Sequence, residues 1–155
     1  RSLPNPFDCL SLTEIAGTFE CGERSLDLWL KTRALANETT GASRTFVTFS
    51  TVTGGAPVIF PWLLIQLIMM FESQIETEYA GTCTCILLGC LVVSKPYQEH
   101  GLGQSLLYEA VRISQHAAQY IGAAVLVVHP ISEKATRFYR KHGFSEEKTE
   151  KTMLF

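Results

Sequence analysis

The chain has 155 residues, of which 46% are hydrophobic and 18% are charged. This length suits one compact domain and the composition excludes a chain that is disordered throughout, so we expect a single domain over residues 1–155. With 13 Lys and Arg against 15 Asp and Glu the net charge is −2, which excludes the strongly basic balance of a dedicated nucleic-acid-binding protein and leaves RNA contacts to local basic patches.

The five cysteines are odd in number and irregular in spacing, which indicates a reduced, cytoplasmic setting rather than a disulfide framework. Cys83 and Cys85 form a CxC pair with no second Cys or His pair at zinc-ligand spacing, so we expect small buried side chains and no metal. The chain starts at Arg1 without the basic-then-apolar order of a signal peptide. We therefore interpret it as a trimmed chain.

Local patterns predict the elements of the first third of the chain. Residues 1–20 are expected to be irregular, because two prolines interrupt them. A helix is predicted over residues 25–37, with Ser25 as its N-cap and one apolar face. Arg44–Ser50 is rich in β-branched and aromatic residues and predicts a strand.

The middle of the chain, residues 56–84, fits two structures. It can form a further strand with a helix, or one long buried helix after Pro61. Within it, residues 58–71 are apolar except for Pro61 and Gln66. A membrane-spanning helix needs about twenty apolar residues, so we expect a buried core element or a partner-facing surface and no membrane insertion.

The second half predicts a βαβ unit. Near-continuous apolar runs at residues 86–93 and 123–129 are typical of strands covered on both faces. Between them, residues 102–120 predict a helix with one apolar face. A second helix is predicted over residues 133–142 and a closing strand over residues 149–155.

The turn between the first strand and the helix of this unit carries two glycines. It reads Pro96-Tyr97-Gln98-Glu99-His100-Gly101-Leu102-Gly103, and the helix is expected to start at Gly103. Glycines let the backbone approach an anion and the free amides of a first helical turn point at it, so a pyrophosphate would fit. A tight turn without a ligand is the alternative. The segment is no dinucleotide fingerprint, because position 106 is Leu106, and no P-loop, because GK[ST] is missing.

The order strand, Q-x-x-G-x-G, helix, strand and A-x-x-F-Y-x-x-x-G-F resembles the acetyl-CoA-binding half of the GNAT N-acetyltransferase superfamily. Its phosphate loop is matched by Gln98, Gly101 and Gly103. Its second signature is matched by Ala135, Phe138, Tyr139, Gly143 and Phe144. The resemblance implies an α/β (α+β) GNAT fold, with a central mixed, mostly antiparallel sheet and a βαβ acetyl-CoA-binding core flanked by helices.

The opening of the chain narrows the resemblance to the TacT/AtaT-type GNAT toxins. The similar segments are Phe19-Glu20-Cys21-Gly22, Leu26-Asp27-x-Trp29-Leu30, Ala34-x-x-Asn37 and Ser43-Arg44-Thr45-Phe46-Val47. This implies an acetyl-CoA-dependent N-acetyltransferase that acetylates the α-amine of aminoacyl-tRNA and inhibits translation. It also implies a ribbon-helix-helix antitoxin as partner and a homodimer.

The same resemblance implies where acetyl-CoA binds, with the pantetheine arm at the end of the first strand of the βαβ unit and the pyrophosphate on the loop amides. The cofactor-binding residues implied are Leu91, Val92, Val93, Gln98, Glu99, His100, Gly101, Leu102, Gly103, Gln104, Ser105 and Phe138. A strand amide near Val93 is the candidate for stabilising the oxyanion of the transition state.

Tyr139 is the candidate catalytic acid, because a phenol is protonated at neutral pH and can donate to the departing thiolate. The alternative is that Tyr139 only packs beside Phe138. A general base is dispensable, since free α-amines titrate near pH 8. His129 and His142 could still assist or could be structural.

Substrate RNA would bind to basic side chains in two regions. The first region is N-terminal and holds Arg24, Lys31, Arg33 and Arg44. The second is the predicted helix near the C-terminus and holds Lys134, Arg137, Arg140 and Lys141. For this second group a solvated helix face is the alternative.

Three positions depart from the family pattern. Cys90 stands where a basic residue is usual, Ser94 where an Asp is usual, and Glu99 where a glycine is frequent. Two other functions therefore stay open. The protein could acetylate a small amine or a protein N-terminus, or it could be a non-catalytic module that binds a partner or dimerises through residues 58–71.

Overall fold

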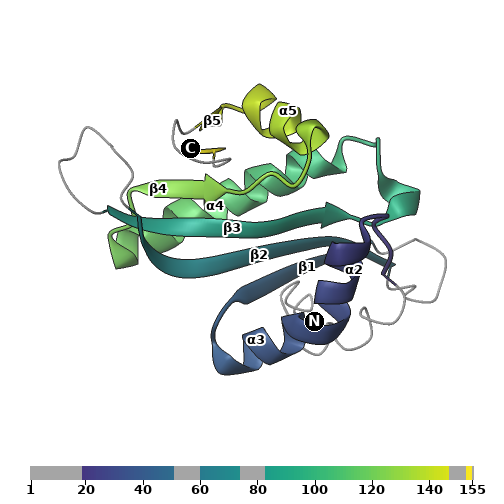
Figure 1. Ribbon diagram of the computed structural model, residues 1–155, viewed down its shortest axis with the longest axis horizontal. Helices are drawn as coiled ribbons and strands as arrows, with labels where there is room; N and C mark the ends of the chain where they lie inside the picture. The colour runs from purple at the N-terminus through teal and green to yellow at the C-terminus, as the bar shows by residue number, and fades with distance from the viewer. Residues whose placement is uncertain (1–18, 51–59, 74–82, 147–152, 155) are drawn as a thin grey trace, which may run out of the picture. The chain divides into compact units, whose positions relative to one another are not determined.

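The computed structural model of the protein describes residues 19–50, 60–73, 83–146 and 153–154 (Figure 1). The chain divides into two compact units. The first unit comprises residues 1–66 and 90–106, and the second comprises residues 67–89 and 107–155. The segments that pass from one unit to the other are β2 (Phe60–Ser73), β3 (Cys83–Val93) and α4 (Leu102–Ile121).

The first described helix is one run of three segments, α2 (Arg24–Trp29), the π-helical η1 (Leu30–Ala34) and α3 (Leu35–Thr40). The predicted N-cap at Ser25 is wrong, because Glu23 occupies the N-cap position. The Ser25 hydroxyl instead donates to the Glu23 carboxylate at 3.1 Å.

This helix runs past the predicted end at Asn37 and stops at Gly41. Gly41 has a φ of 74°, in the left-handed region that glycine adopts without steric cost. The amide of the next residue, Ala42, then donates back to the Asn37 carbonyl at 2.9 Å. The stop signal is therefore the glycine, seven residues beyond Ala34, the last apolar position of the pattern.

The predicted apolar face of this helix is confirmed in the first unit. Leu30 and Ala34, both in the π-helical segment, are buried together with Phe19 and Val92. Because Val92 belongs to β3, this cluster fixes the helix against the end of that strand.

The strand predicted at Arg44–Ser50 is confirmed as β1. Its start is tied to α3 by the buried Glu38 carboxylate, which accepts from the Arg44 guanidinium at 2.9 Å and from the Thr45 amide at 2.8 Å. A carboxylate out of contact with water needs such donors. Arg44 is thereby held in an ion pair with a buried partner.

The ambiguous middle of the chain contains a strand. β2 covers Phe60–Ser73, so the long helix after Pro61 is wrong, and residues 56–59 and 74–82 lie outside the described residues. Pro61 stands at the second position of the strand, where a missing amide is best tolerated. None of the described helices is long and apolar enough to cross a membrane.

The predicted βαβ unit is confirmed by β3, α4 and β4 (Val125–Val128). The two strands pair in parallel, with Cys85 opposite Val125 and Leu88 opposite Val128. β3 begins three residues before the predicted start at residue 86, and β4 is shorter than the predicted 123–129. The apolar run at residues 123–129 is therefore longer than the strand that it predicted.

The C-terminal elements complete a mixed sheet. α5 (Glu133–Lys141) begins after Ser132, whose hydroxyl accepts from the Ala135 amide at 3.2 Å. β5 (Ser145–Glu146), which was not predicted, pairs antiparallel with β6 (Met153–Leu154), and β6 pairs antiparallel with β4. The strand order is β1-β2-β3-β4-β6-β5. Of the predicted strand at 149–155, residues 149–152 and 155 lie outside the described range.

The core of the second unit lies between the β3–β4 pair and α4, which runs along one face of these strands (Figure 1). Its fully buried side chains come from all three elements and are Cys85, Ile86, Leu88, Leu107, Ala110, Leu126, Val127 and Val128. The helix thus covers the strands through the apolar face that its sequence predicts.

Leu88→Ala should lower the free energy of unfolding by about 2–5 kcal/mol, because Leu88 is 1% exposed and its truncation leaves a cavity. Leu35→Ala, at a leucine that is 45% exposed, is the matched control and should change stability by less than about 0.5 kcal/mol. Urea titrations of both variants provide the comparison. Equal losses would contradict the burial described for β3.

Candidate active site

The loop between β3 and α4 has two departures from ordinary backbone geometry, with one residue between them. After the 3₁₀ turn η2 (Lys95–Tyr97), Glu99 adopts a φ of 69° and Gly101 a φ of 76°. Glycine adopts this left-handed conformation freely, whereas a residue with a side chain is strained there by about 1 kcal/mol or more. The bend of the loop therefore strains the backbone at Glu99.

This geometry leaves a row of backbone amides without partners. The amides of Gln104 and Ser105 donate to the Gly101 carbonyl at 3.1 and 3.4 Å. Those of residues 99–103 have no hydrogen bond to the part of the chain that the structure describes. α4 begins at Leu102, one residue before the predicted Gly103. Free amides at the start of a 20-residue helix suit an anion such as a pyrophosphate.

The side chain of Gln98 joins two distant segments. Its amide nitrogen donates to the Cys21 carbonyl at 2.7 Å and to the Val93 carbonyl at 2.9 Å. Both hydrogens of the carboxamide are thus used inside the protein. Gln98 connects the segment before α2 to the end of β3, a role that sequence reasoning missed because Cys21 lies 77 residues earlier.

The place where Gln98 joins the segment before α2 to the end of β3 is called the junction below. Ser94 and Lys95 add three contacts to it. The Lys95 amide donates to the Glu20 carbonyl at 2.8 Å, and the Ser94 hydroxyl donates to this carbonyl at 3.4 Å. The Lys95 ammonium also pairs with the Glu20 carboxylate at 3.4 Å. Ser94, at the position of the family's Asp, is buried in this junction.

The two described cysteines of this unit, Cys21 and Cys90, carry no charge at neutral pH. Burial raises the pKa of the Cys90 thiol to about 11. Burial, and next a hydrogen bond with Asp27, raise the pKa of the Cys21 thiol to about 11. A neutral thiol at position 90 cannot supply the positive charge usual there. The described residues contain no group of His, Cys, Asp and Glu that could hold a metal ion.

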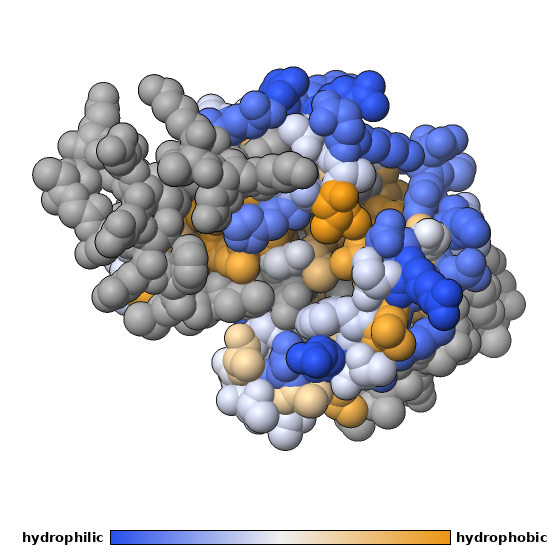
Figure 2. Space-filling view, viewed as in Figure 1, coloured by the Kyte–Doolittle hydropathy of each residue, from blue (hydrophilic) through white to orange (hydrophobic). Residues whose placement is uncertain are grey.

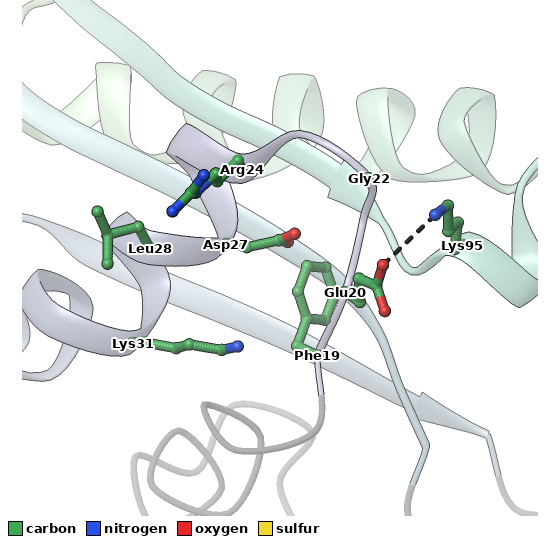
Figure 3. A pocket seen from close by; sticks show the side chains of 8 residues that line it. All are labelled: Phe19, Glu20, Gly22, Arg24, Asp27, Leu28, Lys31 and Lys95. Carbon is green, nitrogen blue, oxygen red and sulfur yellow. Dashed lines mark hydrogen bonds and ion pairs between the residues drawn. The ribbon is translucent and has the colours of Figure 1, made fainter.

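A pocket of about 490 Å³ opens beside the junction in the first unit (Figure 3). Its walls come from the helix face, the segment before the helix and the residue that starts η2. The lining residues are Phe19, Glu20, Gly22, Arg24, Asp27, Leu28, Lys31 and Lys95. No local sequence pattern indicates this pocket, since long-range contacts such as those of Gln98 and Lys95 bring its parts together.

Tyr139 lies in the second unit, on α5, and is 8% exposed. Its ring packs edge-on against Phe138 and Phe144, with ring centroids 5.4 and 5.3 Å apart. His142 packs on Phe138 and its Nδ1 lies 2.7 Å from the Phe138 carbonyl oxygen, while His129 is exposed after β4. The structure thus groups residues 91–93 with 98–105 in the first unit, and Phe138 with Tyr139 in the second.

The basic residues predicted to bind RNA differ in their surroundings. Lys31 and Arg33 are exposed on the first helix, whereas Arg44 pairs with Glu38. On α5, over which hydrophilic side chains gather (Figure 2), Arg140 pairs with Glu146 and Arg137 donates to the Glu133 carbonyl at 3.4 Å. The two lysines of α5, Lys134 and Lys141, are exposed.

Gln98→Ala should lower the free energy of unfolding by about 1–3 kcal/mol, because it leaves the Cys21 and Val93 carbonyls without this donor. Gln104→Ala is the control, since Gln104 is exposed and its side chain makes no hydrogen bond to the described chain. Guanidinium unfolding curves measure both changes. A Gln98→Ala variant as stable as Gln104→Ala would show that the junction does not depend on the carboxamide.

Comparison with known proteins assigns this chain to a family. A model of the GNAT acetyltransferase domain matches residues 67–146. The tRNA-acetylating toxin of Mycobacterium tuberculosis is 33% identical over 135 residues, which cover 86% of this chain and 80% of that protein.

Two solved structures share the fold. AtaT complexed with acetyl-methionyl-tRNAfMet has a TM-score of 0.76 and 21% identity, and the match covers 97% of this chain and 88% of that one. A Tyr-to-Phe variant of AtaT, bound to the C-terminus of the antitoxin AtaR and to acetyl-CoA, has a TM-score of 0.73 and 24% identity over 88% of this chain and 82% of that one. The resemblance drawn from the phosphate loop and the opening segments is confirmed, and the chain belongs to the GNAT acetyltransferase family.

Proposed function

We propose that this protein is an acetyl-CoA-dependent N-acetyltransferase that acetylates the α-amine of aminoacyl-tRNA and thereby inhibits translation. The observation that carries the proposal is the 33% identity with a tRNA-acetylating toxin over most of both chains. In an acetylated α-amine the nitrogen lone pair is delocalised into the new amide carbonyl and can no longer attack in peptide-bond formation. The product would therefore block the ribosome.

The loop before α4 is the proposed site for the pyrophosphate of acetyl-CoA. Its support is the row of unpartnered amides at residues 99–103 and the start of α4 behind them. Gln104, Ser105 and the strand end at residues 91–93 would complete this part of the cofactor site. Phe138 is proposed as a further cofactor-binding residue because the family resemblance implies it. The related AtaT was solved with acetyl-CoA bound. Gln98 contributes to this site by holding the loop, because both its side-chain hydrogens are engaged elsewhere.

Acetyl transfer then requires three actions. The neutral α-amine attacks the thioester carbonyl carbon and the new N–C bond forms, while the amine's extra proton leaves to water. The amide of Val93 is proposed to donate to the oxygen that becomes negative. The C–S bond breaks and the phenol of Tyr139 gives its proton to the departing thiolate. Water or the released amine proton restores the phenol.

We propose that both units act as one acetyltransferase domain. The support is that the family match, residues 67–146, runs through both units, and that β3 and α4 each continue from one into the other. The proposed setting is the cytoplasm, where charged tRNA occurs.

The proposed partners are aminoacyl-tRNA, a ribbon-helix-helix antitoxin and a second copy of the chain. AtaT, which shares the fold, was solved with the C-terminus of its antitoxin. For RNA the exposed cations Lys31, Arg33, Lys134 and Lys141 are the better candidates. Arg44 and Arg140 are weaker ones, because carboxylates already pair with them.

The direct test incubates the protein with bulk charged tRNA and radiolabelled acetyl-CoA. Label on the aminoacyl group, and none on polyamines or on peptides with free N-termini, is the expected result. If only the small amines or the peptides are labelled, one of these is the acceptor and the proposed acceptor is wrong. Binding of a partner protein without any transfer would favour the non-catalytic module.

Tyr139→Phe should leave the Kd for acetyl-CoA unchanged and lower kcat by about 10²–10⁴-fold, because it removes only the proton donor. The ring contacts with Phe138 and Phe144 are retained in this variant. Calorimetry and single-turnover transfer measure the two quantities. A normal kcat would remove Tyr139 from the mechanism.

Glu99→Gly should tighten acetyl-CoA binding several-fold, since it removes a carboxylate beside the proposed pyrophosphate and relieves the strained φ of 69°. Glu99→Gln removes the charge and keeps the strain, so it should tighten binding without raising the unfolding temperature. If neither variant changes the affinity, the phosphates do not lie at this loop.

A further inference from the structure

The pocket of the first unit is lined by one face of the α2–η1 helix. Arg24, Asp27, Leu28 and Lys31 follow one another at intervals of three, one and three residues, which places them on one side of the helix (Figure 3). Opposite them run the backbone of residues 19–22 and the side chain of Lys95. The volume of about 490 Å³ is that of a small-molecule site.

The charges in this pocket are not balanced. Both carboxylates have partners, since Glu20 pairs with Lys95 at 3.4 Å and Asp27 Oδ1 accepts from the Cys21 amide at 2.9 Å. Arg24 and Lys31 make no side-chain hydrogen bond or ion pair with any residue that the structure describes. Three cations, Arg24, Lys31 and Lys95, stand against two carboxylates, Glu20 and Asp27, so the lining has a net charge of +1, which favours an anion. A guanidinium fits a phosphate with two parallel hydrogen bonds.

The pocket adjoins the end of β3. Gln98 Nε2 bridges the carbonyls of Cys21 and Val93, and the residue after Cys21, Gly22, lines the pocket. A Cβ at position 22 would lie 3.4 Å from the Lys95 Cε, an ordinary contact, so it is the φ of 90° that favours glycine at this wall of the pocket. A phosphate held here would therefore lie near the strand amide that we assign to the oxyanion.

We propose that this pocket binds a backbone phosphate of the 3′ end of the tRNA acceptor strand, through Arg24 and Lys31. The inference rests on the proposed function and names the part of the substrate that the pocket recognises. The 3′-phosphate of CoA is the other source of the same chemistry. The RNA is favoured because the pocket adjoins the end of β3, where we place the thioester. The 3′-phosphate of CoA lies beyond the pyrophosphate, at the opposite end of the molecule from the thioester.

The test measures binding of uncharged CpCpA to the whole protein without acetyl-CoA, by calorimetry at several salt concentrations. Lys31→Ala and Arg24→Ala should each weaken binding at least five-fold, and should flatten the plot of log Kd against log salt by about 0.7. Both side chains are exposed, so the variants should fold. Arg112→Ala is the matched control, because it removes a positive charge on α4, where Arg112 pairs with Glu109, and should bind normally.

A second arm measures the Kd for acetyl-CoA in the same variants, which should stay unchanged. Weaker binding of acetyl-CoA together with normal binding of CpCpA would assign the pocket to the cofactor phosphate and overturn the inference. So would a wild-type protein that does not bind CpCpA.

A third arm separates this inference from the proposed function, because CpCpA binding requires no chemistry. If Lys31→Ala loses CpCpA while the wild-type protein fails to acetylate charged tRNA, the proposed function is wrong and the phosphate pocket stands. If the wild-type protein acetylates charged tRNA and both variants do so with normal KM, the pocket is not a site for RNA phosphate.

Discussion

The carboxamide of Gln98 occupies the point at which three parts of the first unit meet. It has two hydrogens, and each goes to a main-chain carbonyl, one before α2 and one at the end of β3. These contacts set where the loop leaves the strand, and hence where α4 begins. The helix cluster around Val92, the loop amides and the pocket next to Gly22 all take their positions from this junction. Such a two-acceptor requirement suits a primary amide and not a carboxylate.

The proposed cofactor contacts are main-chain contacts, and this explains how the site accommodates unusual side chains. Amides of residues 99–103 present the same donors whatever side chains they carry. Glu99 is exposed, so its carboxylate can turn to solvent while its amide stays in the row. Cys90 changes the charge near the strand end but not the backbone there, because β3 continues unbroken to Val93. Departures from the family pattern at these positions therefore alter affinity more than architecture.

Sequence patterns located α4, α5, β1 and the parallel strand pair, because local signals such as one apolar face, a run of β-branched and aromatic residues or a short apolar run mark such elements. β2 could not be assigned, since its apolar run at residues 58–71 is long enough for a helix, whereas the runs at residues 86–93 and 123–129 have the length of a strand. Glu23, and not Ser25, occupies the N-cap position, and its side chain makes no capping hydrogen bond. The preference of capping side chains for this position therefore could not identify it. The junction at Gln98 and the pocket join residues more than seventy positions apart, and one sequence holds no record of such contacts.

Whether a basic side chain is available to RNA likewise depends on contacts that one sequence does not record. The sequence supplied eight candidates for RNA binding, but a carboxylate decides for each whether its charge is available. Glu38 is buried and holds Arg44, and Glu146 holds Arg140. Arg24 and Lys31 differ because the neighbouring acids, Glu20 and Asp27, are engaged by Lys95 and by a main-chain amide. Since the net charge is −2, long-range attraction of RNA is weak, and charges separated by more than about 10 Å are screened at moderate salt. Recognition of the acceptor strand must then depend on these few unpaired cations at short range, where the junction fixes their positions.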